Sequence, residues 1–223
     1  MPFSLYRPIS LHVFARTCLI VALLPIASAQ DITQTCGPVR FEGQTGPFDY
    51  RYERGSILRD VESNHFPPRV EALIRGVSAS VPIGAELDYT LVRFPNHHRA
   101  LVSMIRLGEK TGSQRPSGTQ WSVECYILRA QRYATDDPLV RMIYAQFLGL
   151  RKRYPEALAQ LEQAKSDARD SPFTQHNIGL VYLELGEHEL ALGQAWNAAA
   201  MGFPRQDLKQ ALQQAGKWRE PPP

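Results

Sequence analysis

The chain has 223 residues, of which 25 are lysine or arginine and 22 are aspartate or glutamate. A chain so close to neutrality lacks the concentrated positive charge by which proteins bind nucleic acid, so nucleic acid is not an expected partner. The length suffices for one or two small domains.

The segment 1–29 has the pattern of a secretory signal peptide. Arg16 precedes an apolar run that Pro25 ends, and Ala27 and Ala29 supply the small residues of a cleavage site. A membrane anchor is the alternative, but the run is well short of the roughly 20 residues that span a bilayer. We therefore expect cleavage after Ala29 and a soluble secreted product with no membrane span.

Two cysteines, Cys36 and Cys125, would remain in the exported chain. In an oxidising compartment such a pair is expected to form a disulfide, which would tie an N-terminal arm to a distant helix. Closing so long a loop predicts roughly 4 kcal/mol of stabilisation. The alternative is two unlinked thiols, with Cys125 simply packed in its helix.

The segment between the leader and residue 90 combines turn residues with short helical patterns. Its expected parts are an extended arm over 30–55 with a short strand around Val39–Phe41, a helix over 56–64, a helix from Pro67 to Val77, and an irregular stretch over 78–90.

Residues 91–137 are expected to form a degenerate helical hairpin. Apolar spacing indicates helices over 95–107 and 120–133, and the polar residues 108–119 between them form an enlarged loop.

An internal repeat follows. Aligning Pro138 with Pro172 places Ala145 on Gly179 and Ala157 on Ala191. A period of about 34 residues, with small residues at fixed places, is typical of stacked helical hairpins, each of which buries its apolar face against its neighbours.

These copies resemble tetratricopeptide repeats (TPR). The second copy carries the resemblance most clearly in the run from Asn177 to Leu192, with Gly179, Tyr182 and Gly186 at the family's small, aromatic and turn positions. The first copy departs from the family at Lys152, which replaces the turn glycine. The resemblance implies an all-α, TPR-like helical-hairpin solenoid that binds a protein or peptide.

A second resemblance covers nearly all of the exported chain and implies a periplasmic address without any activity. It is to a group of secreted proteobacterial TPR proteins, and it is carried by Cys36-Gly37-Pro38, Asp49-Tyr50-Arg51, Asp88-Tyr89-Thr90, Pro95-Asn96-His97-His98-Arg99 and Glu124-Cys125-Tyr126.

The TPR resemblance also implies an inner surface formed mainly by the first helix of each hairpin. The family's groove positions fall on Leu139, Met142, Ile143, Gln146 and Gly149 in one copy, and on Phe173, His176, Asn177, Leu180 and Leu183 in the other. Our candidate peptide groove consists of Met142, Gln146, Phe173, His176, Asn177 and Leu180.

This candidate surface is mostly apolar, and the cations that complete a TPR carboxylate clamp are missing from it. An extended or helical apolar segment therefore fits better than a C-terminal carboxylate. The alternative is that the chain's own arm or C-terminal helix fills the groove.

A polar run outside the repeats contains Asp88, His97, His98 and Arg99. Adjacent helical residues point about 100° apart and so rarely share one metal ion, and we expect no metal site. If Asn96 caps the helix, the two histidines lie in its first turn and have a structural role. The alternative is a small ligand-binding or enzymatic module around these four side chains.

The sequence as a whole predicts a secreted, non-catalytic scaffold or adaptor that needs no cofactor, and the second alternative is a purely structural subunit of an envelope complex. The expected segments are a signal peptide over 1–29, an arm with short helices over 30–90, a degenerate hairpin over 91–137, TPR repeats over 138–171 and 172–204, a capping helix over 205–217 and a disordered tail over 218–223.

Overall fold

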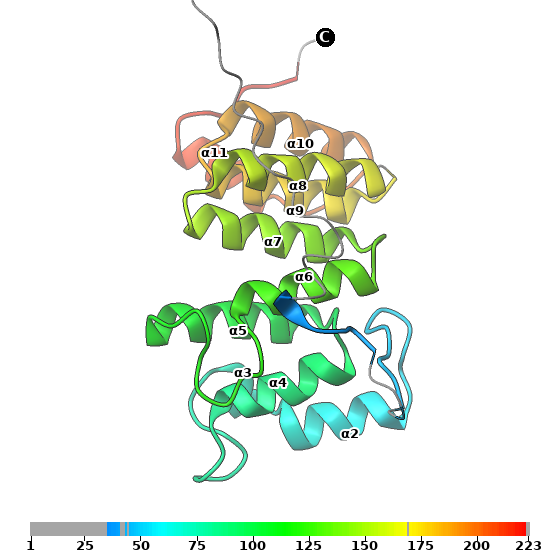
Figure 1. Ribbon diagram of the computed structural model, residues 1–223. Helices are drawn as coiled ribbons and strands as arrows, with labels where there is room; N and C mark the ends of the chain where they lie inside the picture. Colours follow the sequence, from blue (N-terminus) through cyan, green and yellow to red (C-terminus); the bar gives the residue numbers. More distant parts are fainter. Residues whose placement is uncertain (1–34, 41–42, 44, 169, 222–223) are drawn as a thin grey trace, which may run out of the picture.

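The computed structural model describes residues 35–40, 43, 45–168 and 170–221, and every regular element in that part of the chain is an α-helix. The helices form a stack that rises from α2 to α10 (Figure 1). Their bounds are α2 Ser56–His65, α3 Pro68–Glu71, α4 Ile83–Arg93, α5 His98–Thr111, α6 Val123–Tyr133, α7 Pro138–Leu150, α8 Tyr154–Asp167, α9 Pro172–Glu184, α10 His188–Ala200 and α11 Asp207–Gln214. The prediction of an all-α fold is confirmed, whereas the signal peptide and its cleavage after Ala29 fall outside the described residues.

The hairpins α7–α8 and α9–α10 begin in the same way. Asp137 caps α7 by accepting hydrogen bonds from the N–H groups of Leu139 and Val140, at 3.1 and 3.4 Å. Ser171 caps α9 by accepting from the N–H of Thr174 at 3.3 Å. A proline then opens each helix, at the one place where a helix does not use the missing N–H.

Small residues let the two helices of each hairpin approach closely. Ala145, Ala157 and Ala191 are completely buried. A methyl group added to Gly179 would come within 2.4 Å of a Leu208 methyl carbon, so a side chain there would push α11 away from α9. These contacts fix the spacing of the helices within the repeated part.

One short turn recurs before α5, α7 and α9. In each case the C-cap residue of the preceding helix accepts a hydrogen bond from the N–H three residues on, and that donor residue then caps the next helix. The acceptor–donor pairs are Phe94–His97, Ala134–Asp137 and Ala168–Ser171, with N–O distances of 3.0, 3.2 and 3.0 Å.

The spacing of these turns shows how the first one differs from the other two. Asp137 and Ser171 have the same separation in sequence as Pro138 and Pro172, whereas His97 and Asp137 stand six positions further apart than that. The enlarged loop over 112–122 takes up the difference. The same turn joins α4 to α5 and α6 to α7. The repetition therefore extends one helix further toward the N-terminus than predicted. The predicted boundary at residue 90 therefore lies inside α4.

The prediction that residues 78–90 are irregular holds for 78–82 and is wrong for 83–90, which belong to α4. Pro82 occupies the N-cap of α4, so both it and the preceding turn residues lie outside the helix. Leu87 and Leu91, one turn apart, are buried against the neighbouring helices. Burial of this stripe outweighs the low helix propensity of Gly84.

Three other helices are shorter than predicted at one end, and one of them, α6, begins at Val123 rather than at Gln120. α3 is a single turn, because Leu73 adopts a left-handed backbone with φ 57° and ends the segment. α5 begins at His98 rather than at Pro95. The strand expected around Val39–Phe41 is not seen at Val39 and Arg40, and Phe41 lies outside the described residues.

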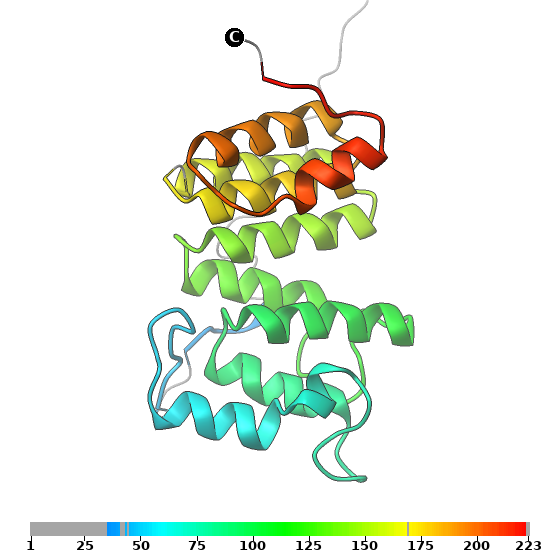
Figure 2. The same cartoon turned by 180° about the vertical axis from the view of Figure 1, so that it is seen from behind.

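The main hydrophobic core runs along the stack from Phe66 to Leu212, and a smaller cluster of Leu58, Val61 and Phe94 joins α2 to the end of α4. Within it α5 packs against α7 and α7 packs against α9, while α8 and α10 pair with α7 and α9 on the other side. α11 closes the end of the stack, with Leu208 and Leu212 completely buried (Figure 2). None of the described helices combines the length and apolar character needed to cross a membrane.

Candidate functional site

A groove runs along the face of the stack that α5, α7 and α9 form. Two adjoining cavities of about 360 Å³ each open there, and both are lined by Val102, Arg106, Gln146 and Glu184. The first two residues belong to α5, Gln146 to α7 and Glu184 to α9. Because α7 lies between the other two helices, it forms the floor, and α5 and α9 form the walls. We call this feature the inner groove.

Five of the six predicted groove residues line the inner groove, namely Met142, Gln146, Phe173, Asn177 and Leu180. Phe173 is 46 % exposed although it is a large apolar side chain. That these residues bind a peptide remains a prediction.

The sixth residue, His176, does not line either cavity, and its place in the predicted groove is corrected. Only 2 % of it is exposed, because the segment that leads into α11 covers it. Its ring lies 4.9 Å from that of Phe203, and its Nε2 lies 2.8 Å from an oxygen of Asp207. His176 therefore belongs to the interface with the capping helix.

The sequence analysis missed most of the α5 wall. The family's groove positions were counted only from Pro138 and Pro172. The same count from His98, the first residue of α5, would have found that wall. It gives Arg99, Val102, Ser103, Arg106 and Glu109, of which the first four line the groove and Glu109 does not.

The predicted polar site is not assembled as one cluster. His98 and Arg99 line the inner groove, but Asp88 and His97 do not. Asp88 is buried in α4, where it accepts hydrogen bonds from the Tyr126 hydroxyl and from Gln120 Nε2, the latter at 2.8 Å. It connects α4 to the loop before α6, which is a structural contact.

His97, not Asn96, is the N-cap of α5. Its Nδ1 accepts a hydrogen bond from the N–H of Ala100 at 3.2 Å, which leaves Nε2–H to donate to Glu62 at 3.1 Å. The ring stacks on Tyr50 with centroids 4.0 Å apart. Complete burial, helped by the charge of Arg99, lowers the pKa of His97 to about 3, so this histidine is neutral at physiological pH.

Asn96 and His98 instead join a polar cluster between the arm and the start of α7, which we call the polar clasp. Its members are Asp49, Arg51, Asn96, His98 and Asp137. Asn96 donates to both carboxylates, at 2.8 Å to Asp49 and 3.0 Å to Asp137, and His98 Nε2 lies 2.8 Å from Asp137. Asp137, which caps α7, thus also anchors the start of α5.

The arm side of the polar clasp is strongly charged. Arg51 Nη2 donates to Asp49 at 2.7 Å and to Asp136 at 2.8 Å. Burial on its own would raise the pKa of Asp49, but hydrogen bonds from Arg51 and Asn96 outweigh it and lower the pKa to about 2. The clasp therefore holds the arm to the first turn of α7.

Arg99, on the groove rim, is neutralised by two carboxylates. Its Nε donates to Glu71 at 2.8 Å, a second nitrogen also donates to Glu71, and Nη1 lies 3.3 Å from Glu62. The hydrogen bonds from Arg99 lower the pKa of Glu71.

Within the described residues no group of three or more His, Cys, Asp or Glu side chains could hold a metal ion. The expected lack of a metal and of a cofactor stays a prediction.

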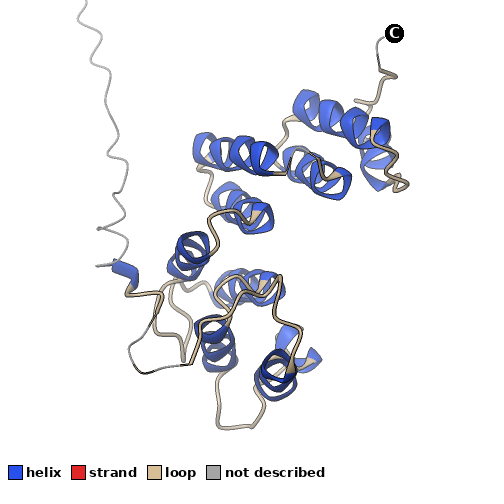
Figure 3. Ribbon diagram, turned by 90° about the vertical axis from the view of Figure 1, so that its right-hand side faces the viewer, coloured by secondary structure: helices blue, strands red, loops and turns tan. Residues whose placement is uncertain are grey.

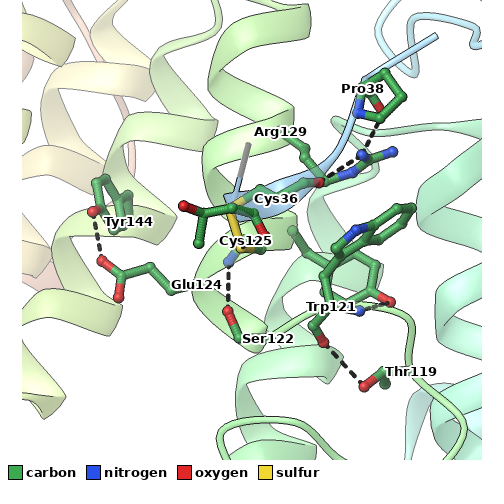
Figure 4. The surroundings of a disulfide bond; sticks show 11 residues. Cys36, Pro38, Thr119, Trp121, Ser122, Glu124, Cys125, Arg129 and Tyr144 are labelled. Atoms are coloured by element: carbon green, nitrogen blue, oxygen red, sulfur yellow. Dashed lines mark hydrogen bonds between the residues drawn. A yellow bond between two sulfur atoms is a disulfide. The ribbon is translucent and has the colours of Figure 1, made fainter. Parts of the chain in front are cut away.

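The predicted disulfide between Cys36 and Cys125 is present (Figure 4). Beside it the buried guanidinium of Arg129 donates to the carbonyls of Cys36 and Pro38, and it lies 3.7 Å from the ring centroid of Trp121. Burial lowers the pKa of Arg129 to about 10. The disulfide and these bonds fix the beginning of the arm on α6, on the side of the helix that carries Cys125.

Comparisons of this chain with protein-family models, with curated proteins and with solved structures each found no match. The functional argument therefore rests on the geometry of the inner groove.

Proposed function

We propose that this protein is a TPR-type scaffold or adaptor of the bacterial periplasm that binds a peptide segment of another protein in its inner groove. The observation that supports this most directly is an open groove with exposed apolar side chains in place of a filled core. Val102 is 38 % exposed and Phe173 is 46 % exposed, and both line the groove. Apolar surface gathered in a concavity is typical of binding sites for peptides.

The repeat structure supports the TPR assignment. Two hairpins share capping, a small-residue contact and a left-handed turn, each at the offset that separates Pro138 from Pro172. The cystine supports an oxidising compartment, in line with the secretory leader expected over 1–29. The chain's own capping helix covers His176 and leaves the groove beside it open, which favours an external ligand.

The two rival functions have less support. A catalytic module built on Asp88, His97, His98 and Arg99 would need these side chains in one pocket, yet Asp88 and His97 are buried elsewhere. A structural subunit would need an apolar patch on the outer helix faces. In the described parts of the outer helices α8 and α10 and their C-caps, the exposed large apolar residues are Tyr154, Leu190 and Met201, and Tyr154 lines a cavity of the inner groove.

Peptide display tests the proposal. A random dodecapeptide library would be selected on the exported chain, and the affinity of enriched peptides would be measured by fluorescence anisotropy. Val102→Asp places a charge in the groove, and Leu190→Asp places one on a matched site, 39 % exposed, that lines neither cavity. We expect Val102→Asp to weaken binding by about tenfold or more, equivalent to roughly 1.4 kcal/mol, and Leu190→Asp to leave it unchanged. Equal effects of both variants, or no enriched peptide, would refute the proposal.

A further inference from the structure

The charges that line the inner groove are not all neutralised by the protein. Arg99 is bonded to Glu71 and Glu62, and His98 lies against Asp137. Arg106 is exposed, and among the described residues no carboxylate lies within ion-pair distance of it. The positive charge of Arg106 lowers the pKa of Glu71, but by less than the hydrogen bonds and charge of Arg99 do. Arg106 is therefore a positive charge left for a ligand.

Glu184 is the negative counterpart. It is exposed, and it accepts one hydrogen bond, at 2.9 Å, from the neutral amide of Gln146. Arg106 belongs to α5 and Glu184 to α9, so the two charges lie on opposite walls, while Gln146 lies between them on α7. Both line each of the two cavities, yet they form no ion pair with each other.

Gln146 lies between the two charges, and the floor beside it along α7 is apolar, with Met142 and Ile143 lining one of the two cavities. Figure 3 shows the three-helix face nearly end-on, with the chain rising obliquely from the arm to the C-terminus. A ligand that contacts both charges would pass over Gln146 and rest on the apolar floor beside it.

We propose that the inner groove takes an amphipathic peptide segment that presents an acidic side chain to Arg106, a basic side chain to Glu184, and apolar side chains to the floor around Met142 and Ile143. This inference rests on the proposed function and adds the ligand's composition and orientation. A guanidinium binds a carboxylate with good geometry, and charges at the rim of an interface mainly select and orient the partner. A ligand of uniform charge would meet repulsion on one wall.

Charge reversal tests the orientation. From a peptide enriched on the wild-type chain, one version has each acidic residue replaced by lysine, and another has each basic residue replaced by glutamate. We expect the first version to bind the wild type about tenfold more weakly and to regain most of its affinity on Arg106→Glu. We expect the second version to regain affinity on Glu184→Arg and not on Arg106→Glu.

Arg75→Glu is the matched control, since Arg75 is exposed and lines neither cavity. It should leave every affinity unchanged, and circular dichroism should show the same helix content in all variants. If Val102→Asp weakens binding but neither Arg106→Glu nor Glu184→Arg changes the affinity of any peptide version, this inference alone is overturned. Failure to enrich any peptide, or indifference to Val102→Asp, would overturn the proposed function together with it.

Discussion

In the C-terminal half of the stack, from α7 to α10, neighbouring helices meet through alanine and glycine at positions that recur from one hairpin to the next. In the N-terminal half, from the arm to α6, the helices differ in length and are joined by contacts between distant residues. In the C-terminal half, the small size of Gly179 and Ala191 lets the helices pack closely. In the N-terminal half, the polar clasp and the Cys36–Cys125 disulfide hold the elements together.

The comparison shows two ways of positioning the same groove. Repeated packing positions α7 and α9. In contrast, α5 is positioned by His97 and Asn96, which lie just before its first turn and form hydrogen bonds with Glu62 and Asp49. Because α5 forms one wall of the groove, the position of that wall depends on side-chain contacts that the repeat pattern does not predict.

The largest expected effect comes from removing the disulfide. The double variant Cys36→Ser, Cys125→Ser frees a loop of 89 residues, which should lower the free energy of unfolding by about 4 kcal/mol. If the two halves are held differently, the loss should fall mainly on the N-terminal half. Hydrogen exchange should therefore quicken in α5 and α6 much more than in α9 and α10.

Reduced wild-type protein serves as the control and should match the double variant. Uniform acceleration of exchange along the stack would show that the two halves unfold together, and the comparison would then not hold. No change in stability at all would contradict the role given to the disulfide.

The sequence predicted the C-terminal half of the stack better than the N-terminal half. The repeat located α7 to α10 and five of the six groove residues, because packing between repeats acts at fixed positions. The sequence also indicated the disulfide, since only two cysteines would remain after the expected cleavage and two have one way to pair. The recurrence of the turn at Phe94–His97 was hidden by the enlarged loop after α5.

The rest could not be predicted because it depends on which distant side chains meet. Asp88 and His98 are close in sequence and looked like one site, but α4 turns Asp88 toward Tyr126 while His98 faces Asp137. His176 falls on a groove position of the repeat, and only the path of the segment before α11 shows that it is covered. α4 was missed because its Pro82 and Gly84 suggested a turn.

A second prediction uses pH to separate the halves. The pKa of buried His97 is lowered from 6.5 to about 3, so its neutral form stabilises the fold above pH 6.5, and this contribution is lost as pH falls toward 3. Between pH 7 and pH 5 the loss should reach about 2 kcal/mol. His97→Asn keeps a capping oxygen but removes this titration, so its free energy of unfolding should change less with pH than that of the wild type.

His176 offers the corresponding test in the C-terminal half. Burial lowers the pKa of His176 too, but the nearby carboxylate of Asp207 works against that shift. Urea unfolding of His176→Asn should therefore show a smaller loss of pH dependence than His97→Asn. If both variants keep the full pH dependence of the wild type, the titrating groups lie elsewhere.

The smallest expected effect concerns the two equivalent turns within the C-terminal half. Lys152 and Gly186 both adopt left-handed backbone, with φ 59° and 83°, and both are exposed. A side chain added at Gly186 would meet no atom within 4 Å, so substitution there acts through the backbone alone. A residue with a side chain is disfavoured in this conformation by about 1 kcal/mol relative to glycine.

Lys152→Gly should therefore raise the free energy of unfolding, by less than about 1 kcal/mol because glycine also gives the unfolded chain more freedom. Gly186→Lys should lower it by a similar amount. Thermal unfolding of the two single variants and of the double variant measures both effects. If the double variant matches the wild type, the left-handed positions of the two turns are energetically interchangeable. If Lys152→Gly is destabilising, Lys152 makes a contact in the turn that outweighs its backbone strain, and the first hairpin then shares with the N-terminal half its dependence on individual side chains.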